Sequence, residues 1–152
     1  MNPYYETIET TLINLDFKKE ESSLSDFKAA FTRRKLLTSL VFLIQEVNDK
    51  DFNAVSMKNV ITLGRQWCEN NLNAMWFIKE SGLNIVLLHH GQIDLNDIKG
   101  LIDLTGFHGT ICQSITILDL TNGCIEQEKT LVVIGKVKKV LQKLKEISYM
   151  LI

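Results

Sequence analysis

Proline is almost absent from this chain, and its absence constrains the fold more than any other feature of the sequence. Pro3 is the only proline among 152 residues, and the eight glycines are thinly spread. Because proline and glycine most often interrupt helices, few positions force the backbone out of a helical conformation. The turn signals that an all-β protein needs roughly every 8–12 residues lie mainly between Gly82 and Gly123. The sequence therefore favours helix, most strongly in its first half.

Length and composition predict a single globular domain, residues 1–152. A chain of this length can bury roughly 70% of the surface that it exposes when unfolded, and its 45% hydrophobic and 23% charged residues are typical of globular proteins. Residues 1–11 lack the basic start and apolar stretch of a secretory signal. The longest apolar run, residues 36–44, is far shorter than the roughly 20 residues that cross a bilayer. We therefore expect a cytoplasmic protein with no membrane partner.

Apolar residues at helical spacing predict three helices in the first half of the chain. The stripe that marks a short opening helix consists of Tyr5, Ile8, Leu12 and Leu15. The segment 27–47 is interpreted as one long helix, and its later half is apolar nearly all round, so we expect that half at the centre of the core. Ser56 is predicted to cap a further helix, which Asn70 and Asn71 end.

In the second half of the chain, helices are predicted over 72–79 and from Asp94 or Asn96 to Gly106. The closing helix has an apolar stripe made by Ile134, Val137, Leu141, Leu144, Ser148 and Leu151. Its neighbouring lysines are expected to flank the core, with their charged ends in water.

Two segments suit either helix or strand. The apolar run 83–88 is short enough for a buried strand or a buried helical turn, and we favour the helix. The dipeptide Asn122-Gly123 is a strong hairpin signal when strands flank it, so 114–120 and 124–134 form either a ribbon or two helices.

One window resembles a helical repeat. The residues NAMWFIKESGLNIVLL, which follow the helix VITLGRQWCENN, are similar to the turn between helices in armadillo-type repeats. We therefore predict an all-α fold of about six or seven helices, arranged as a bundle or a short armadillo- or HEAT-like stack. The alternative is an α+β fold with a hairpin near 114–134, in which 83–88 is also a strand.

Histidine and cysteine are the residues that would carry metal or nucleophilic chemistry here. The candidates are Cys68, Cys112, Cys124, His89, His90 and His108. An odd number of widely spaced cysteines fits reduced thiols better than a disulfide framework. No Cys-x-x-Cys or His-Glu-x-x-His motif accompanies them, so we predict no metal site. A cysteine-dependent enzyme remains an alternative hypothesis, and structural, buried thiols are the preferred interpretation.

Motifs for nucleotide and hydrolase chemistry are missing from the sequence. It contains no Gly-x-Gly-x-x-Gly, no phosphate loop and no Gly-x-Ser-x-Gly turn. We therefore predict no cofactor, no catalytic residues and no enzymatic activity. Trp67 and Trp76 are candidate partner anchors, for which core packing is the preferred interpretation. The basic run 33–35 is interpreted in the same way as a solvated face, and the chain is not predicted to bind nucleic acid.

Charge is unevenly distributed along the chain. Residues 55–128 hold four basic and eight acidic side chains, whereas residues 129–152 hold six basic and one acidic. An acidic face attracts a basic protein and raises the rate of association. The partner-binding residues predicted on this basis are Glu69, Glu80, Asp94, Asp97 and Asp103.

In size, cytosolic character, lack of motifs and mixed acidic surface, the chain resembles small bacterial immunity proteins, which neutralise a toxin delivered by a neighbouring cell. That resemblance implies a stoichiometric inhibitor that covers or distorts a cognate toxin such as a nuclease, without turnover. It transfers no site residue to this chain. A helical adaptor or scaffold protein without a toxin partner is the alternative.

Overall fold

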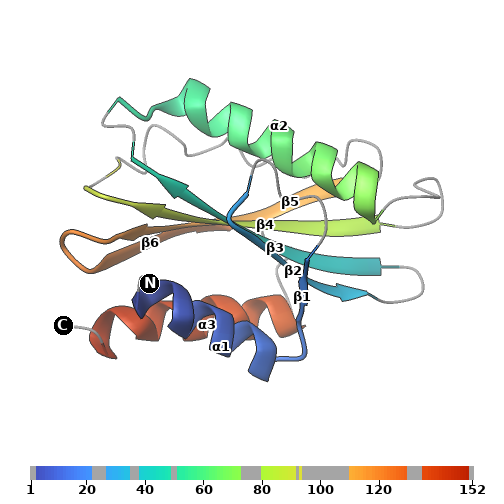
Figure 1. Ribbon diagram of the computed structural model, residues 1–152, viewed down its shortest axis with the longest axis horizontal. Helices are drawn as coiled ribbons and strands as arrows, with labels where there is room; N and C mark the ends of the chain where they lie inside the picture. The colour runs from blue at the N-terminus through green and yellow to red at the C-terminus, as the bar shows by residue number, and fades with distance from the viewer. Residues whose placement is uncertain are drawn as a thin grey trace.

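A mixed sheet lies between two helical layers (Figure 1). The computed structural model describes residues 3–21, 27–34, 38–48, 51–72, 80–91, 93, 110–129 and 135–150. Its helices are α1 (Pro3–Asn14), α2 (Ala54–Asn71) and α3 (Gly135–Met150). Its strands are β1 (Lys18–Glu20), β2 (Ala29–Arg34), β3 (Thr38–Val47), β4 (Glu80–His89), β5 (Thr110–Asp119) and β6 (Cys124–Lys129).

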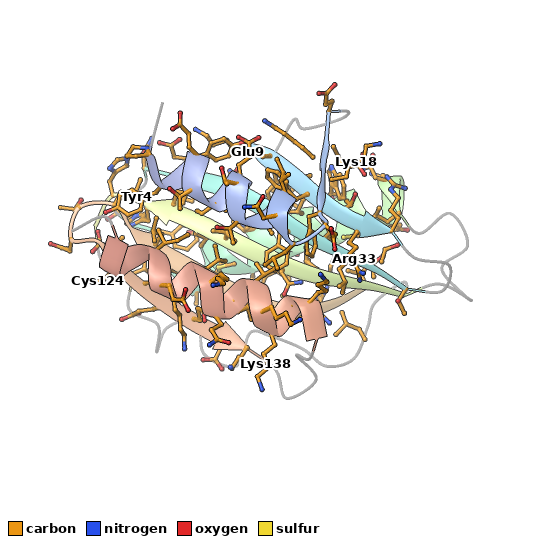
Figure 2. All side chains as sticks on the ribbon, turned by 90° about the horizontal axis from the view of Figure 1, so that it is seen from below. Tyr4, Glu9, Lys18, Arg33, Cys124 and Lys138 are labelled. Carbon is orange, nitrogen blue, oxygen red and sulfur yellow. The ribbon has the colours of Figure 1, made fainter. Side chains whose placement is uncertain are left out.

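The six strands of the described residues lie side by side in the order of the sequence. β3 pairs with β4 and β4 with β5 in parallel, and the remaining neighbours are antiparallel. α2 covers one face, while α1 and α3 lie side by side across the other (Figures 1 and 2). Parallel strands covered on both faces are the arrangement in which strand sequences become continuously apolar.

The predicted all-α fold is therefore wrong, and so is the helical repeat. Within the segment predicted as one helix, residues 29–34 and 38–47 form β2 and β3, and the run 83–88 belongs to β4. β3 is apolar on both of its faces because successive side chains enter the two different cores on either side of the sheet. Gly82 lies within β4 and ends no helix. The α+β alternative is confirmed, because β5 and β6 pair as a hairpin around Asn122-Gly123.

The opening, third and closing helices are confirmed. Asn53, not Ser56, caps α2: its side chain accepts the backbone N–H groups of Val55 and Ser56, and the Ser56 hydroxyl accepts the backbone N–H of Asn53 in return. α2 ends at Asn71, as predicted. The predictions for residues 73–79, for a helix from 94 or 96 to 106, and for 130–134 fall outside the described residues.

The sheet separates two apolar clusters. On the α2 side, Met57, Ile61 and Trp67 pack against alternate residues of β3, β4 and β5. A Cβ atom on Gly64 would lie 3.0 Å from Leu83, so a residue without a side chain allows α2 to approach the sheet here. None of the helices in the described part of the chain is both long and apolar enough to cross a membrane.

The second cluster lies between the sheet and the α1–α3 layer. The residues that α1 contributes to it are Tyr5, Ile8 and Leu12, and those from α3 include Val137, Val140, Leu141 and Leu144. Phe17 packs edge to face on Phe42 of β3, with ring centroids 5.3 Å apart. The α3 lysines stay outside this core, and Lys138, labelled in Figure 2, is exposed.

Candidate functional site

The predicted acidic face is only partly within the described residues. Glu69 is exposed near the end of α2. Glu80 opens β4, but its side chain lies outside the described part. Asp94, Asp97 and Asp103 lie outside it as well, so the structure does not bring these five acids together, and the face stays a prediction.

The other residues singled out from the sequence fall in separate places. Trp67 is buried in the α2-side core, which confirms its packing interpretation. Arg34 donates to Glu20 at 3.2 Å and to the carbonyl oxygen of Asn71 at 3.2 Å, so it fixes the end of α2 to the sheet. Trp76 and His108 lie outside the described residues. No group of three metal-ligating side chains occurs within the residues that are described.

The carboxyl ends of the parallel strands β3, β4 and β5 lie at one end of the sheet. Sequence reasoning missed the cluster of polar groups found there. Open α/β sheets commonly bind their ligands beyond the carboxyl ends of such strands. β4 ends at His89 and β5 at Asp119, which are both buried. The backbone N–H of Leu120 donates to the carbonyl oxygen of His89 at 2.8 Å and so ties the two strand ends together.

Asp119 organises this end of the sheet. One of its carboxylate oxygens, Oδ1, accepts the backbone N–H groups of Gly91, Thr121 and Asn122 at 3.2, 2.9 and 3.2 Å. The other, Oδ2, accepts the side-chain amide of Asn122 at 2.7 Å. Burial by itself raises the pKa of Asp119, but the hydrogen bonds from Asn122, Thr121 and Gly91 outweigh it and hold the pKa below its ordinary value.

We expect Asp119→Asn to lower the free energy of unfolding near pH 7 by about 1–3 kcal/mol, because an amide cannot accept all four hydrogen bonds. The carboxylate contributes its full stabilisation above the pKa of an unfolded aspartate, about 3.9, and loses it as pH falls through the lower pKa of the folded state. The gap between wild type and variant should therefore narrow on acidification. Urea unfolding at several pH values measures it, and a gap independent of pH would contradict this role.

His89 is held in place at the same end of the sheet. Its Nδ1 lies 2.7 Å from the carbonyl oxygen of Gly91, and its ring lies 6.2 Å from that of Phe52. A carbonyl oxygen only accepts hydrogen bonds, so this contact assigns the proton to Nδ1. His90 is exposed, and its Nε2 lies 3.7 Å from a carboxylate oxygen of Glu46. The neighbouring histidines thus have different surroundings, and His89 has a structural role.

A cavity of about 360 Å³ lies beside these strand ends on the α2 side of the sheet. The residues that line it are Ile93, Ile117, Asp119, Asn122, Cys124 and Glu126. Glu126 is opposite Ile117, and Glu128 is opposite Ile115, in the β5–β6 pair. Because directly opposed residues share a face, both carboxylates lie on the α2 side. We name Glu126 and Glu128 the acidic edge.

The acidic edge has no counter-charge among the residues that the structure describes. Neither Glu126 nor Glu128 makes an ion pair or a side-chain hydrogen bond within the described residues, whereas Glu9, Glu20 and Glu46 are each paired with a basic side chain. Both are half-buried. The sequence signal for this feature was the two-residue spacing of the glutamates after a hairpin dipeptide, which places them on one face of a strand.

The cysteines divide into two buried thiols and one exposed thiol. Burial raises the pKa of the Cys112 thiol to about 12 even though the nearby Arg65 charge lowers it. Burial, and to a lesser extent Cys112, also raises the pKa of Cys68 well above its ordinary value. Since the thiolate is the nucleophile, neither buried thiol has the environment of a catalytic cysteine.

Alkylation of the folded protein by iodoacetamide at neutral pH should therefore label Cys124 alone. Cys68 and Cys112 should react only in denaturant, because they are fully buried and their pKa values are raised. Peptide mapping by mass spectrometry after a time course reads out each site. Rapid labelling of Cys68 or Cys112 in the folded protein would revive the cysteine-enzyme hypothesis.

Comparison with known proteins finds no match for this chain among protein families, curated proteins or solved structures.

Proposed function

We propose that this chain is a stoichiometric protein-binding inhibitor: a cytoplasmic immunity protein that neutralises a cognate toxin with a basic surface, such as a nuclease. The observation that carries the proposal is the acidic edge, two half-buried carboxylates on the terminal strand of the sheet that have no counter-charge within the described part of the chain. Carboxylates in that setting gain from a basic partner, because the partner supplies the charge that the described part of the protein does not.

The distribution of positive charge supports the same proposal. The exposed lysines of α3, which include Lys138, Lys139 and Lys145, belong to the opposite helical layer from the face that carries Glu126 and Glu128. Such a separation orients an approaching basic protein toward the acidic edge and away from α3. Electrostatic steering of this kind raises the association rate and falls steeply with salt.

The test has two stages. The tagged protein is first used to capture partners from its native cells, and a captured partner is then purified and its toxic activity, nuclease activity for example, is titrated with this chain. Neutralisation that is complete at a one-to-one ratio supports the proposal. A captured partner that stays active at excess inhibitor, or neutralisation far below one equivalent, contradicts stoichiometric inhibition.

The same titration decides whether the acids predicted from the sequence take part. Charge reversal at Glu80, Asp94 and Asp97 together should raise the dissociation constant if the acidic middle segment forms the interface. Unchanged neutralisation by that triple variant would remove this version and leave the acidic edge as the binding surface.

A further inference from the structure

β6 is the terminal one of the described strands, and its backbone edge is the structural basis of the inference. Within the described residues β6 pairs with β5 alone. A terminal strand directs alternate backbone N–H and C=O groups away from its neighbour, where an added strand can pair with them. Its residues are exposed or half-buried along their whole length, in contrast to the buried residues that dominate β5.

Charge argues against a second copy of this chain as the added strand. An antiparallel pairing centred on Gln127 would place Glu126 of each copy opposite Glu128 of the other. Like charges in directly opposed positions destabilise a strand pair. Half-buried carboxylates make this repulsion stronger than it is between fully exposed charges. The acidic edge therefore disfavours self-association.

The two faces of β6 specify the sequence of the strand that fits. On the α2 side, Glu126 and Glu128 favour lysine or arginine at two successive same-face positions. On the opposite side, Ile125 packs against the cluster under α1 and α3, which favours an apolar residue opposite Ile125, directly beside the basic pair on the other face of the added strand. Alternation of basic and apolar residues is thus the complementary pattern.

We propose that β6 is a docking edge that receives an extended segment of alternating basic and apolar residues from a partner protein as a seventh strand. This inference rests on the proposed inhibitory function for the partner's identity, but the docking edge itself stands on the strand order and on two carboxylates that no described residue pairs with.

The probe is a synthetic peptide that alternates lysine and valine, compared with a peptide of the same composition in which lysines and valines form separate blocks. Isothermal titration calorimetry should show binding of the alternating peptide and at least about tenfold weaker binding of the block peptide. Affinity should also fall as salt increases. Equal affinity for the two peptides would overturn strand addition, because simple charge attraction ignores alternation.

Two sets of variants sharpen the test. Glu126→Lys with Glu128→Lys should weaken binding of the alternating peptide by at least about tenfold. The matched control is Glu6→Lys with Glu21→Lys, which changes net charge equally at exposed positions away from β6 and should have a much smaller effect. Equal losses in the two double variants would overturn the assignment to β6.

Backbone pairing has its own readout. Peptides that are N-methylated at alternate residues lose their hydrogen-bond donors along one edge only, so one methylation register should abolish binding and the other should preserve it. Identical effects of both registers would overturn the proposal. If the purified toxin is neutralised equally by wild type and by the β6 double variant, the docking edge fails while the inhibitory function stands. If the peptide binds as expected but no captured partner is neutralised, the inhibitory function fails while the docking edge stands.

Discussion

Replacing Phe42 with alanine should lower the free energy of unfolding by about 3–5 kcal/mol. Phe42 is fully buried in β3, where Phe31 lies directly opposite it on β2 and Phe17 packs edge to face on its ring. Truncation removes the buried ring and leaves a cavity that the sheet backbone cannot collapse to fill. The variant also loses the aromatic pair with Phe17, an interaction of about 0.5–1.5 kcal/mol beyond its buried area.

Urea unfolding followed by tryptophan fluorescence and circular dichroism measures this loss. Ile13→Ala is the matched control, because Ile13 is half exposed on α1 and its truncation should change stability by no more than about 0.5 kcal/mol. Phe42→Leu should fall between the two. A loss below about 1 kcal/mol for Phe42→Ala would show that β3 is not the centre of the core.

Asn84→Asp should lower the free energy of unfolding by as much as Phe42→Ala does. Its effect should also depend on pH, whereas the effect of a cavity should not. Asn84 is fully buried in β4, where its side-chain amide donates to the carbonyl oxygen of Val41 at 3.3 Å and to Oε1 of Gln113 at 3.0 Å. Its own oxygen accepts the Ser114 hydroxyl at 2.5 Å. An aspartate would direct a second acceptor oxygen at two acceptors and would bury a charge without a counter-ion. Near pH 7 this should cost about 3–5 kcal/mol.

The pH dependence follows from where the proton is held more tightly. Burial raises the pKa of an aspartate at position 84 in the folded state, so the folded protein binds the proton more tightly than the unfolded chain does. The deficit relative to wild type should therefore be smallest below the unfolded pKa of about 3.9 and should grow as pH rises above it. Asn59→Asp, at an exposed position of α2, is the control and should show little pH-dependent deficit. A pH-independent loss for Asn84→Asp would mean that water reaches this site.

The two substitutions are not independent. Phe42 and Asn84 are paired across β3 and β4 and share the face toward α1 and α3. The buried amide therefore lies next to an aromatic ring, and the double variant should deviate from additivity, as neighbouring residues do. Two paired positions of the sheet thus combine a buried aromatic ring and a buried amide on the same face.

Helices that cover one face of the sheet could be predicted from the sequence. The apolar stripes of α1 and α3 have the helical period because only one side of each helix is buried. Asn71 ended α2 as predicted, while the cap was predicted at Ser56 and lies three residues earlier, at Asn53. Periodicity on a half-buried helix contains enough information to identify the element.

The central strands could not be identified in the same way. β3 and β4 contact apolar layers on both faces, so the alternation that marks a strand is erased, and a run such as Leu83–Leu88 is equally compatible with a buried helix. The hairpin alternative survived because Asn122-Gly123 is a local signal that does not depend on the faces of the sheet. In the absence of alternation, β-branched residues in β5 were the remaining sign of strand.

The candidate site was predictable only in its charge. Sequence reasoning identified an acidic middle segment, residues 55–128, which contains Glu126 and Glu128. Their position on a terminal strand beside a cavity depends on the pairing of β5 and β6 and on the strand order, which are long-range properties. Asp119 was likewise visible as a residue three positions before Asn122, but its role required the end of β4 to reach it.

The placement of α1 and α3 in one layer has a consequence for the newly made chain. Synthesis proceeds from the amino terminus at about 5–20 residues per second, so α1 leaves the ribosome well before its neighbour α3. Strands β1 to β5 and α2 can therefore assemble while α3 is still being made, but the apolar stripe of Tyr5, Ile8 and Leu12 is completed only by residues after 135. A nascent chain interrupted before that point presents the α1 side of its sheet, not the α2 side, to chaperones and proteases.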